Sequence, residues 1–192
     1  RHPEALRWLG LVAQSGGRFA EALGLIDQAL VINPRAIEYL NDQGNILLSL
    51  QRAGEAAAAY RKALELAPGH PHILNGLGNA MQAQGAREPA LEAYRQAIAN
   101  QPDFADAHHN SANVLHECGD YAKALAAYRV AVGLKPAYAS AYSNMANTLR
   151  ALGRLEEALQ AVQMAQRLQA PNSDAENTLG TILHELGRAD EA

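Results

Sequence analysis

Asparagine recurs along this sequence at a constant interval. Asn45, Asn79, Asn113 and Asn147 are each separated by 34 residues. A side-chain amide carries both hydrogen-bond donors and an acceptor, so it complements a peptide unit with its one N–H and one C=O. We expect such a row to hold the backbone of an extended polypeptide with modest affinity, whatever the side chains of that polypeptide are.

Five more asparagines accompany this row. Asn110 and Asn144 precede two of its members by three residues, and Asn41, Asn75 and Asn177 lie about one helical turn from it. Asparagine is unfavourable inside a helix because its side chain competes for backbone hydrogen bonds, so its repeated use needs a reason. Peptide contact is one reason, and hydrogen bonding between adjacent repeats is the other. The sequence leaves both open.

The histidines do not have the spacing of a metal site. His109 and His116 are seven residues apart, whereas zinc ligands on one helix are usually three or four apart, and neither His108 nor Glu117 supplies an evident third ligand. We expect surface or groove histidines and no bound metal. Nucleophile-elbow, P-loop and dinucleotide-binding motifs are missing as well. We therefore predict no catalytic residue, no cofactor and no enzyme activity for this chain.

Composition argues against nucleic acid as the partner. The 192 residues carry a formal net charge of −4, and the sequence lacks the basic stripe that is typical of nucleic-acid binding. No apolar run is long enough to span a membrane, and no export signal is visible. The single Cys118 cannot form an internal disulfide and is expected to be a small buried residue. A cytoplasmic location is the default expectation, and the start at Arg1 suggests a fragment of a longer protein.

The elements that position the asparagines follow from an internal period. Prolines stand at 34, 68, 102 and 136, and turn glycines recur in the same rhythm at Gly17, Gly85, Gly119, Gly153 and Gly187. Gln51 occupies the missing glycine position, and nearby Gly54 is expected to replace it as the turn residue. Apolar residues within each unit have helical spacing, and none alternates as a strand would. We predict an all-α solenoid of stacked helix hairpins with about 11–12 helices.

We assign the whole chain, 1–192, to one array. The repeats are about 3–36, 37–70, 71–104, 105–138 and 139–172, with a partial sixth at 173–192. Small residues recur where the two helices of a unit should cross, namely Gly44, Gly78, Ala112, Ala146 and Gly180. A hairpin cannot bury its apolar stripe alone, so stacking supplies the stability.

Each unit resembles the tetratricopeptide repeat. The third unit shows the pattern as Leu74, Leu77, Gly78 and Met81, followed by Ala90, Tyr94, Ala97 and Pro102. Val162 departs from it where the other units carry tyrosine, and His108 and Glu176 depart from it early in their first helices. The resemblance implies a right-handed superhelix whose first helices line a concave groove for a protein or peptide partner. The nine asparagines would then lie in that groove.

Charged residues assigned to the same groove suggest a mildly acidic lining. Arg7 and Arg150 are outnumbered there by Glu38, Asp42, Asp106, Glu117, Asp174 and Glu185. We expect a slight preference for basic or neutral peptides. The lysine and arginine rows with which some members of this family capture a C-terminal carboxylate are missing.

A narrower likeness concerns the asparagine segments. Asn-Gly-Leu-Gly-Asn at 75–79, His-Asn-Ser-Ala-Asn at 109–113 and Ser-Asn-Met-Ala-Asn at 143–147 resemble the repeat arm of O-GlcNAc-transferase-like glycosyltransferases. That likeness implies an alternative function, the substrate-recruiting arm of a larger glycosyltransferase. A further alternative is a scaffold that self-associates through the open C-terminal end.

Overall fold

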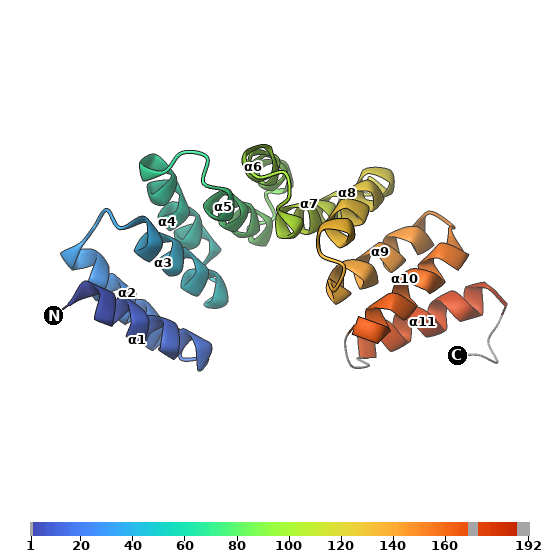
Figure 1. The fold of residues 1–192 in the computed structure, drawn as a ribbon, viewed down its shortest axis with the longest axis horizontal. Coiled ribbons are helices and arrows are strands. Elements are labelled where there is room, and N and C mark those ends of the chain that lie inside the picture. Colours follow the sequence, from blue (N-terminus) through green and yellow to red (C-terminus); the bar gives the residue numbers. More distant parts are fainter. Residues whose placement is uncertain (1, 169–172, 188–192) are drawn as a thin grey trace. The chain divides into compact units, whose positions relative to one another are not determined.

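The fold consists of paired antiparallel helices. The computed structural model describes residues 2–168 and 173–187, and within them it contains eleven α-helices and no strand. The helices are α1 (Pro3–Ser15), α2 (Phe19–Ile32), α3 (Ile37–Ser49), α4 (Ala53–Leu66), α5 (Pro71–Ala83), α6 (Arg87–Asn100), α7 (Ala105–Glu117), α8 (Tyr121–Leu134), α9 (Ala139–Ala151), α10 (Leu155–Leu168) and α11 (Ser173–Glu185) (Figure 1). The predicted all-α helical-repeat fold is confirmed.

The turn inside each hairpin depends on a left-handed residue. Glycine takes it at Gly17, Gly85, Gly119, Gly153 and Gly187, with φ between 71° and 80°. Gln51 adopts φ 59° at the equivalent position between α3 and α4, although a side chain disfavours this conformation. The expectation that Gly54 serves as the turn residue is wrong, because Gly54 lies inside α4.

Small residues on the first helix admit the tyrosine of the second helix. A Cβ added to Gly44 would lie 2.6 Å from Tyr60, and one added to Gly78 would lie 2.4 Å from Tyr94. Both rings are completely buried. In the hairpin of α7 and α8, Ala112 takes the place of these glycines opposite Tyr128. Both Ala112 and Tyr128 are buried. The close helix crossing predicted from the small residues is therefore present.

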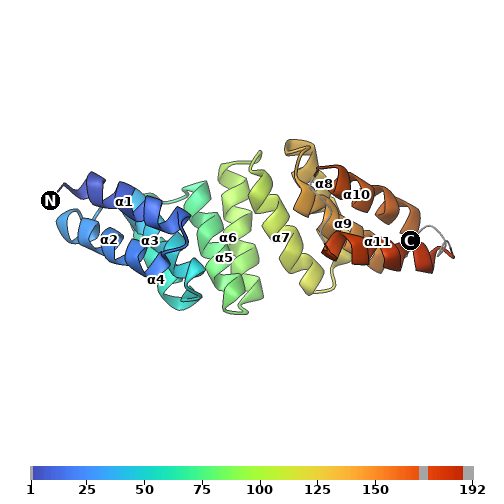
Figure 2. The same ribbon diagram turned by 90° about the horizontal axis from the view of Figure 1, so that it is seen from below.

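The helices fall into two compact units, which we describe separately. The N-terminal unit, Arg1–Pro102, holds α1 to α6, and the C-terminal unit, Asp103–Ala192, holds α7 to α11. Each second helix packs on its own first helix and, inside a unit, on the next first helix; the pair α5 and α6 is seen side by side in Figure 2. The hairpins begin at Pro3, Ile37, Pro71, Ala105, Ala139 and Ser173. A single array over 1–192 stays a prediction.

First helices also contact one another within each unit. In the N-terminal unit α3 contacts both α1 and α5, and in the C-terminal unit α9 contacts both α7 and α11. We call the surface made by α1, α3 and α5, and separately that made by α7, α9 and α11, the first-helix face of the unit. These faces carry the asparagines.

The single cysteine, Cys118, is exposed, so its expected burial is wrong. It caps the C-terminus of α7 next to the turn at Gly119. None of the helices in the described part of the chain is long and apolar enough to cross a membrane. The predicted second helix of the sixth repeat would begin among residues 188–192, outside the described residues.

Candidate functional site

Three asparagines of the row are held by the tyrosine of their own hairpin. The hydroxyl of Tyr60 donates to Oδ1 of Asn45 at 2.7 Å, and that of Tyr94 donates to Oδ1 of Asn79 at 2.8 Å. Tyr128 likewise donates to Oδ1 of Asn113 at 2.6 Å. The tyrosine rings are buried, so their hydroxyls need a partner. The amide oxygen is thereby fixed toward the tyrosine, and the amide nitrogen is directed away from it.

Burial also keeps these tyrosines protonated. Removal from water raises the pKa of the Tyr60 and Tyr128 hydroxyls well above the ordinary value for tyrosine. A neutral hydroxyl is the donor that an amide oxygen requires. The orientation of the amides is therefore insensitive to pH across the physiological range.

Asn147 has a different environment because its hairpin lacks the tyrosine. Val162 replaces that residue and is completely buried. Oδ1 of Asn147 instead accepts from Oγ1 of Thr178 on α11, at 3.4 Å. This contact is longer than the tyrosine contacts, so the fourth amide is held less firmly than the other three.

Asn144 links two neighbouring first helices of the C-terminal unit. Its Nδ2 donates to Oδ1 of Asn113 on α7 at 2.9 Å and lies 3.3 Å from Nε2 of His109. Both of these partners lie on α7. Asn144 therefore serves the stacking of α9 on α7, which was the alternative role for the asparagines.

His109 is buried rather than exposed in a groove, contrary to the sequence expectation. It is 8% exposed and packs against the rings of Tyr128 and Tyr138. Because Asn144 presents a donor to Nε2, the proton resides on Nδ1, which lies 3.1 Å from the Tyr138 hydroxyl. Burial lowers the pKa of His109, with Lys135 adding to the effect and Asn110 and Asp106 opposing it.

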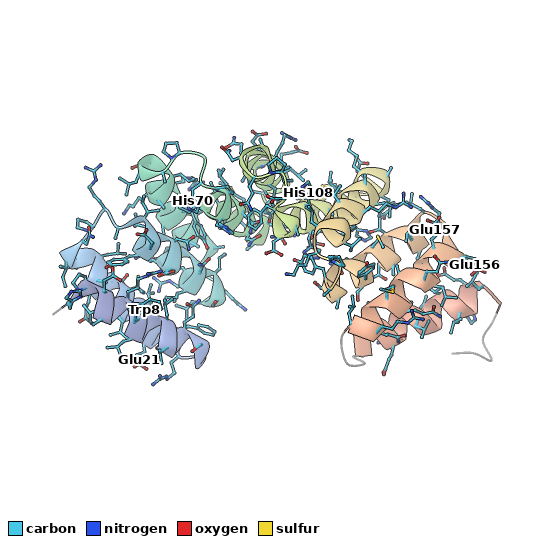
Figure 3. The ribbon with its side chains drawn as sticks, in the orientation of Figure 1. Trp8, Glu21, His70, His108, Glu156 and Glu157 are labelled. Atoms are coloured by element: carbon cyan, nitrogen blue, oxygen red, sulfur yellow. The ribbon has the colours of Figure 1, made fainter. Side chains whose placement is uncertain are left out.

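The other two histidines of α7 differ in their surroundings. His116 is engaged by Thr148, whose Oγ1 lies 2.9 Å from its Nδ1. His108 lies on α7 (Figure 3) and is partly exposed. No group of three or more histidine, cysteine, aspartate or glutamate side chains in the described part of the chain could hold a metal ion.

The remaining predicted site residues vary in exposure. Asn41, Asn75 and Asn110 are partly buried, whereas Asn45 and Asn177 are exposed. Asn41 lines a cleft of about 300 Å³ in the N-terminal unit, together with residues of α1 and α5. The sequence did not single out this cleft, because three different helices contribute to it.

Several charges assigned to the groove are paired with one another. Nε of Arg7 donates to Asp42 at 2.6 Å, and Arg150 donates to Glu185 at 2.9 Å. Asp42 is buried, and this burial raises its pKa, while the hydrogen bond and charge of Arg7 act in the opposite direction. Asp106 lies 3.6 Å from Nζ of Lys135. In both units these cations of the first-helix face are therefore neutralised by neighbouring carboxylates.

These features define a helical-hairpin repeat protein. Models of the tetratricopeptide repeat match residues 1–37, 9–71, 41–87, 76–103, 93–126 and 139–167, and a model described as TPR repeat matches 112–149. The chain belongs to the tetratricopeptide-repeat family. The comparison with curated proteins finds no match.

Solved structures share the fold. The chain is similar to the type IV pilus biogenesis factor PilW, with a TM-score of 0.90, 20% identity and coverage of 98% of this chain and 87% of PilW. It is also similar to TTC0263, a thermophilic TPR protein of Thermus thermophilus, with a TM-score of 0.79, 24% identity and coverage of 95% and 99%. YrrB, a TPR protein described as having an unusual peptide-binding site, has a TM-score of 0.68, 20% identity and coverage of 90% and 89%.

Proposed function

We propose that the chain is a protein-interaction scaffold that binds extended peptide segments of a partner on the first-helix faces of its two units. The observation that carries the proposal is the pairing of Asn45, Asn79 and Asn113 with buried tyrosines. This pairing occupies the amide oxygens and directs the amide nitrogens away from the hairpin core. Such N–H donors, at Asn45 and Asn79 in the N-terminal unit and at Asn113 in the C-terminal unit, are suited to the carbonyl oxygens of an extended backbone.

The hydrogen bonds of the individual asparagines distinguish those that would contact a peptide from the one that would stabilise helix stacking. Asn113 accepts two hydrogen bonds at Oδ1, from Tyr128 and Asn144, so its nitrogen is the group that can serve a peptide. The amide nitrogen of Asn144 is engaged by Asn113 and His109 on α7. We therefore assign peptide contact to Asn45, Asn79 and Asn113, and a stacking role to Asn144. The peptide-binding site reported for YrrB, which shares this fold, is consistent with such a use of the repeats.

A pair of matched triple variants tests the proposal. Substitution of Asn45, Asn79 and Asn113 by alanine removes the amides together with their tyrosine contacts. Substitution of Tyr60, Tyr94 and Tyr128 by phenylalanine removes the same three hydrogen bonds and leaves the amides in place. Each protein is immobilised and exposed to a random peptide library, at a temperature where circular dichroism shows both variants to be folded.

The proposal predicts that the wild type captures peptides of many sequences, that the phenylalanine variant retains capture at reduced affinity, and that the alanine variant loses it. Equal capture by the alanine variant and the wild type would refute peptide contact by these asparagines. Loss of capture in both variants would mean that the orientation given by the tyrosines is essential, which also supports the proposal.

Self-association is a second candidate, and an exposed apolar patch on α1 favours it. Trp8, Leu9 and Val12 are 61%, 57% and 60% exposed, and Trp8 is labelled on α1 in Figure 3. Val12 occupies the register position of Ile46 and Val114, both completely buried. Contiguous apolar surface of this kind is typical of interaction sites. Light scattering over a range of concentrations should show an association that Trp8→Gln weakens, and a strictly monomeric wild type would rule it out.

The likeness of the asparagine segments to a glycosyltransferase arm stays a prediction. In that case the first-helix faces would recruit protein substrates for a catalytic domain elsewhere in a larger protein. Sequencing of the parent gene beyond Ala192 decides the matter: a following nucleotide-sugar-binding domain would support it, and any other domain would remove it.

A further inference from the structure

A cleft in the N-terminal unit lies on the first-helix face, where the proposed peptide would pass. It has a volume of about 300 Å³ and is lined from α1, α3 and α5, with His70 at the junction between α4 and α5 (Figure 3). This volume is at the lower end of the roughly 300–1,000 Å³ typical of ligand pockets. The cleft is therefore sized for a single side chain rather than for a large cofactor.

Two isoleucines and two imidazole rings form one part of the cleft wall, and Arg7, Glu38 and Asn41 form the rest. Ile37 and Ile73 belong to its lining, and Ile73 is 1% exposed. The imidazole rings of His70 and His72 lie 5.9 Å apart along the same wall. Such walls suit the aliphatic stem of a long side chain, whose methylene groups gain from leaving water.

The charges around the cleft leave one carboxylate available. Arg7 is engaged by Asp42 at 2.6 Å, and the hydroxyl of Tyr39 donates to Glu4. Glu38, by contrast, is exposed, lines the cleft and forms no ion pair with any described residue. The carboxylates of Glu4, Glu38 and Asp42 all act electrostatically on Arg7, so carboxylates outnumber cations around the cleft.

The charges and the apolar side chains that line the cleft favour a cationic occupant over an anionic one. An anionic group would have to compete with Asp42 for Arg7 and would face Glu38 directly. A cationic group with an aliphatic stem finds two isoleucines and the carboxylate of Glu38 in the same lining. We infer that the cleft of Arg7, Ile37, Glu38, Asn41, His70 and Ile73 is a specificity pocket for a lysine or arginine side chain of the bound peptide. The inference rests on the proposed function, since the peptide backbone delivers this side chain.

Two small probes test the pocket without knowledge of the natural partner. The probes are N-acetyl-lysine methylamide and the norleucine counterpart, which has the same stem without the charge. Binding at millimolar concentration is followed by NMR through the Ile37 methyl groups and the ring protons of His70 and His72. Glu38→Gln removes the carboxylate, and Glu88→Gln, an exposed position on α6, is the matched control for charge.

We expect the lysine probe to bind about two- to fivefold more tightly than the norleucine probe, the usual scale for an exposed ion pair. The preference should vanish in Glu38→Gln, persist in Glu88→Gln and weaken at high salt. Equal binding of the two probes to the wild type, or a preference that survives in Glu38→Gln, would overturn the inference. Library capture that persists alongside equal probe binding would separate this failure from a failure of the proposed function.

Discussion

Replacement of Gly78 by alanine tests the helix crossing on which the amide orientation depends. The added Cβ would lie 2.4 Å from Cε1 of Tyr94, whereas ordinary carbon–carbon contact is about 3.5–4.0 Å. The ring must therefore move by roughly 1 Å. It is completely buried, and its hydroxyl is tied to Asn79 at 2.8 Å, so it has no open direction in which to move.

The expected loss of stability is a balance of opposing effects. Overpacking a filled core usually costs about 1–3 kcal/mol, and a strained tyrosine–asparagine hydrogen bond adds up to about 1 kcal/mol. Alanine in a helix interior returns about 1 kcal/mol relative to glycine. In the hairpin of α7 and α8, Ala112 and Tyr128 are both buried, so a methyl group does occur at the equivalent crossing. We therefore expect a net loss of about 1–2 kcal/mol.

Thermal unfolding followed by circular dichroism measures this loss. For a chain of this length we expect the midpoint to fall by roughly 2–8 °C. Gly24→Ala is the control, because Gly24 lies inside α2 and a Cβ there meets nothing within 4 Å. That variant should be more stable than the wild type by up to about 1 kcal/mol. A Gly78→Ala protein as stable as Gly24→Ala would refute the assigned packing.

Three further predictions follow from single residues. Gln51→Gly should raise the unfolding midpoint slightly, because relief of the left-handed strain of about 1 kcal/mol exceeds the flexibility gained by the unfolded chain; a lower midpoint would contradict this. Tyr128→Phe should cost about 1 kcal/mol in urea unfolding, and no change would show that its bond to Asn113 is not formed. The pKa of His109 is lowered in the folded state, so the contribution of the neutral imidazole to the free energy of unfolding should be fully present above the ordinary value of 6.5 and be lost as the pH falls below it. His109→Asn should flatten this pH dependence. An unaltered pH profile in that variant would refute the buried neutral imidazole.

The architecture could be predicted because the period repeats the same physical demand many times. Each unit needs a helix, a turn, a second helix and a small residue at the crossing. Where the pattern of one unit is weak, the register of the neighbouring units still predicts its helices and its turn. Helix starts at Pro3, Ile37 and Pro71 follow directly from this register. Gln51 is the exception, because the turn after α3 adopts the left-handed conformation without glycine.

The chemistry of the first-helix face could be predicted only in part. The asparagine row was visible from spacing, but its oxygens are committed to tyrosines, which depends on how deeply the second helix sits against the first. His109 occupies the register position of Asn41 and Asn75, yet it is buried because Tyr138 and Tyr128 enclose it. Such enclosure is set by three helices together and leaves no local pattern in the sequence.

The most direct measurement of the central claim observes the side-chain amides themselves. Protein labelled with ¹⁵N at asparagine is titrated with a peptide selected from the library, and the side-chain NH₂ resonances are assigned by single substitutions. The account predicts that the resonances of Asn45 and Asn79 shift together and saturate at one peptide concentration, that the resonance of Asn113 also shifts, and that the resonance of Asn144 moves little. Shifts confined to asparagines outside the first helices, such as Asn100 at the end of α6, would contradict it.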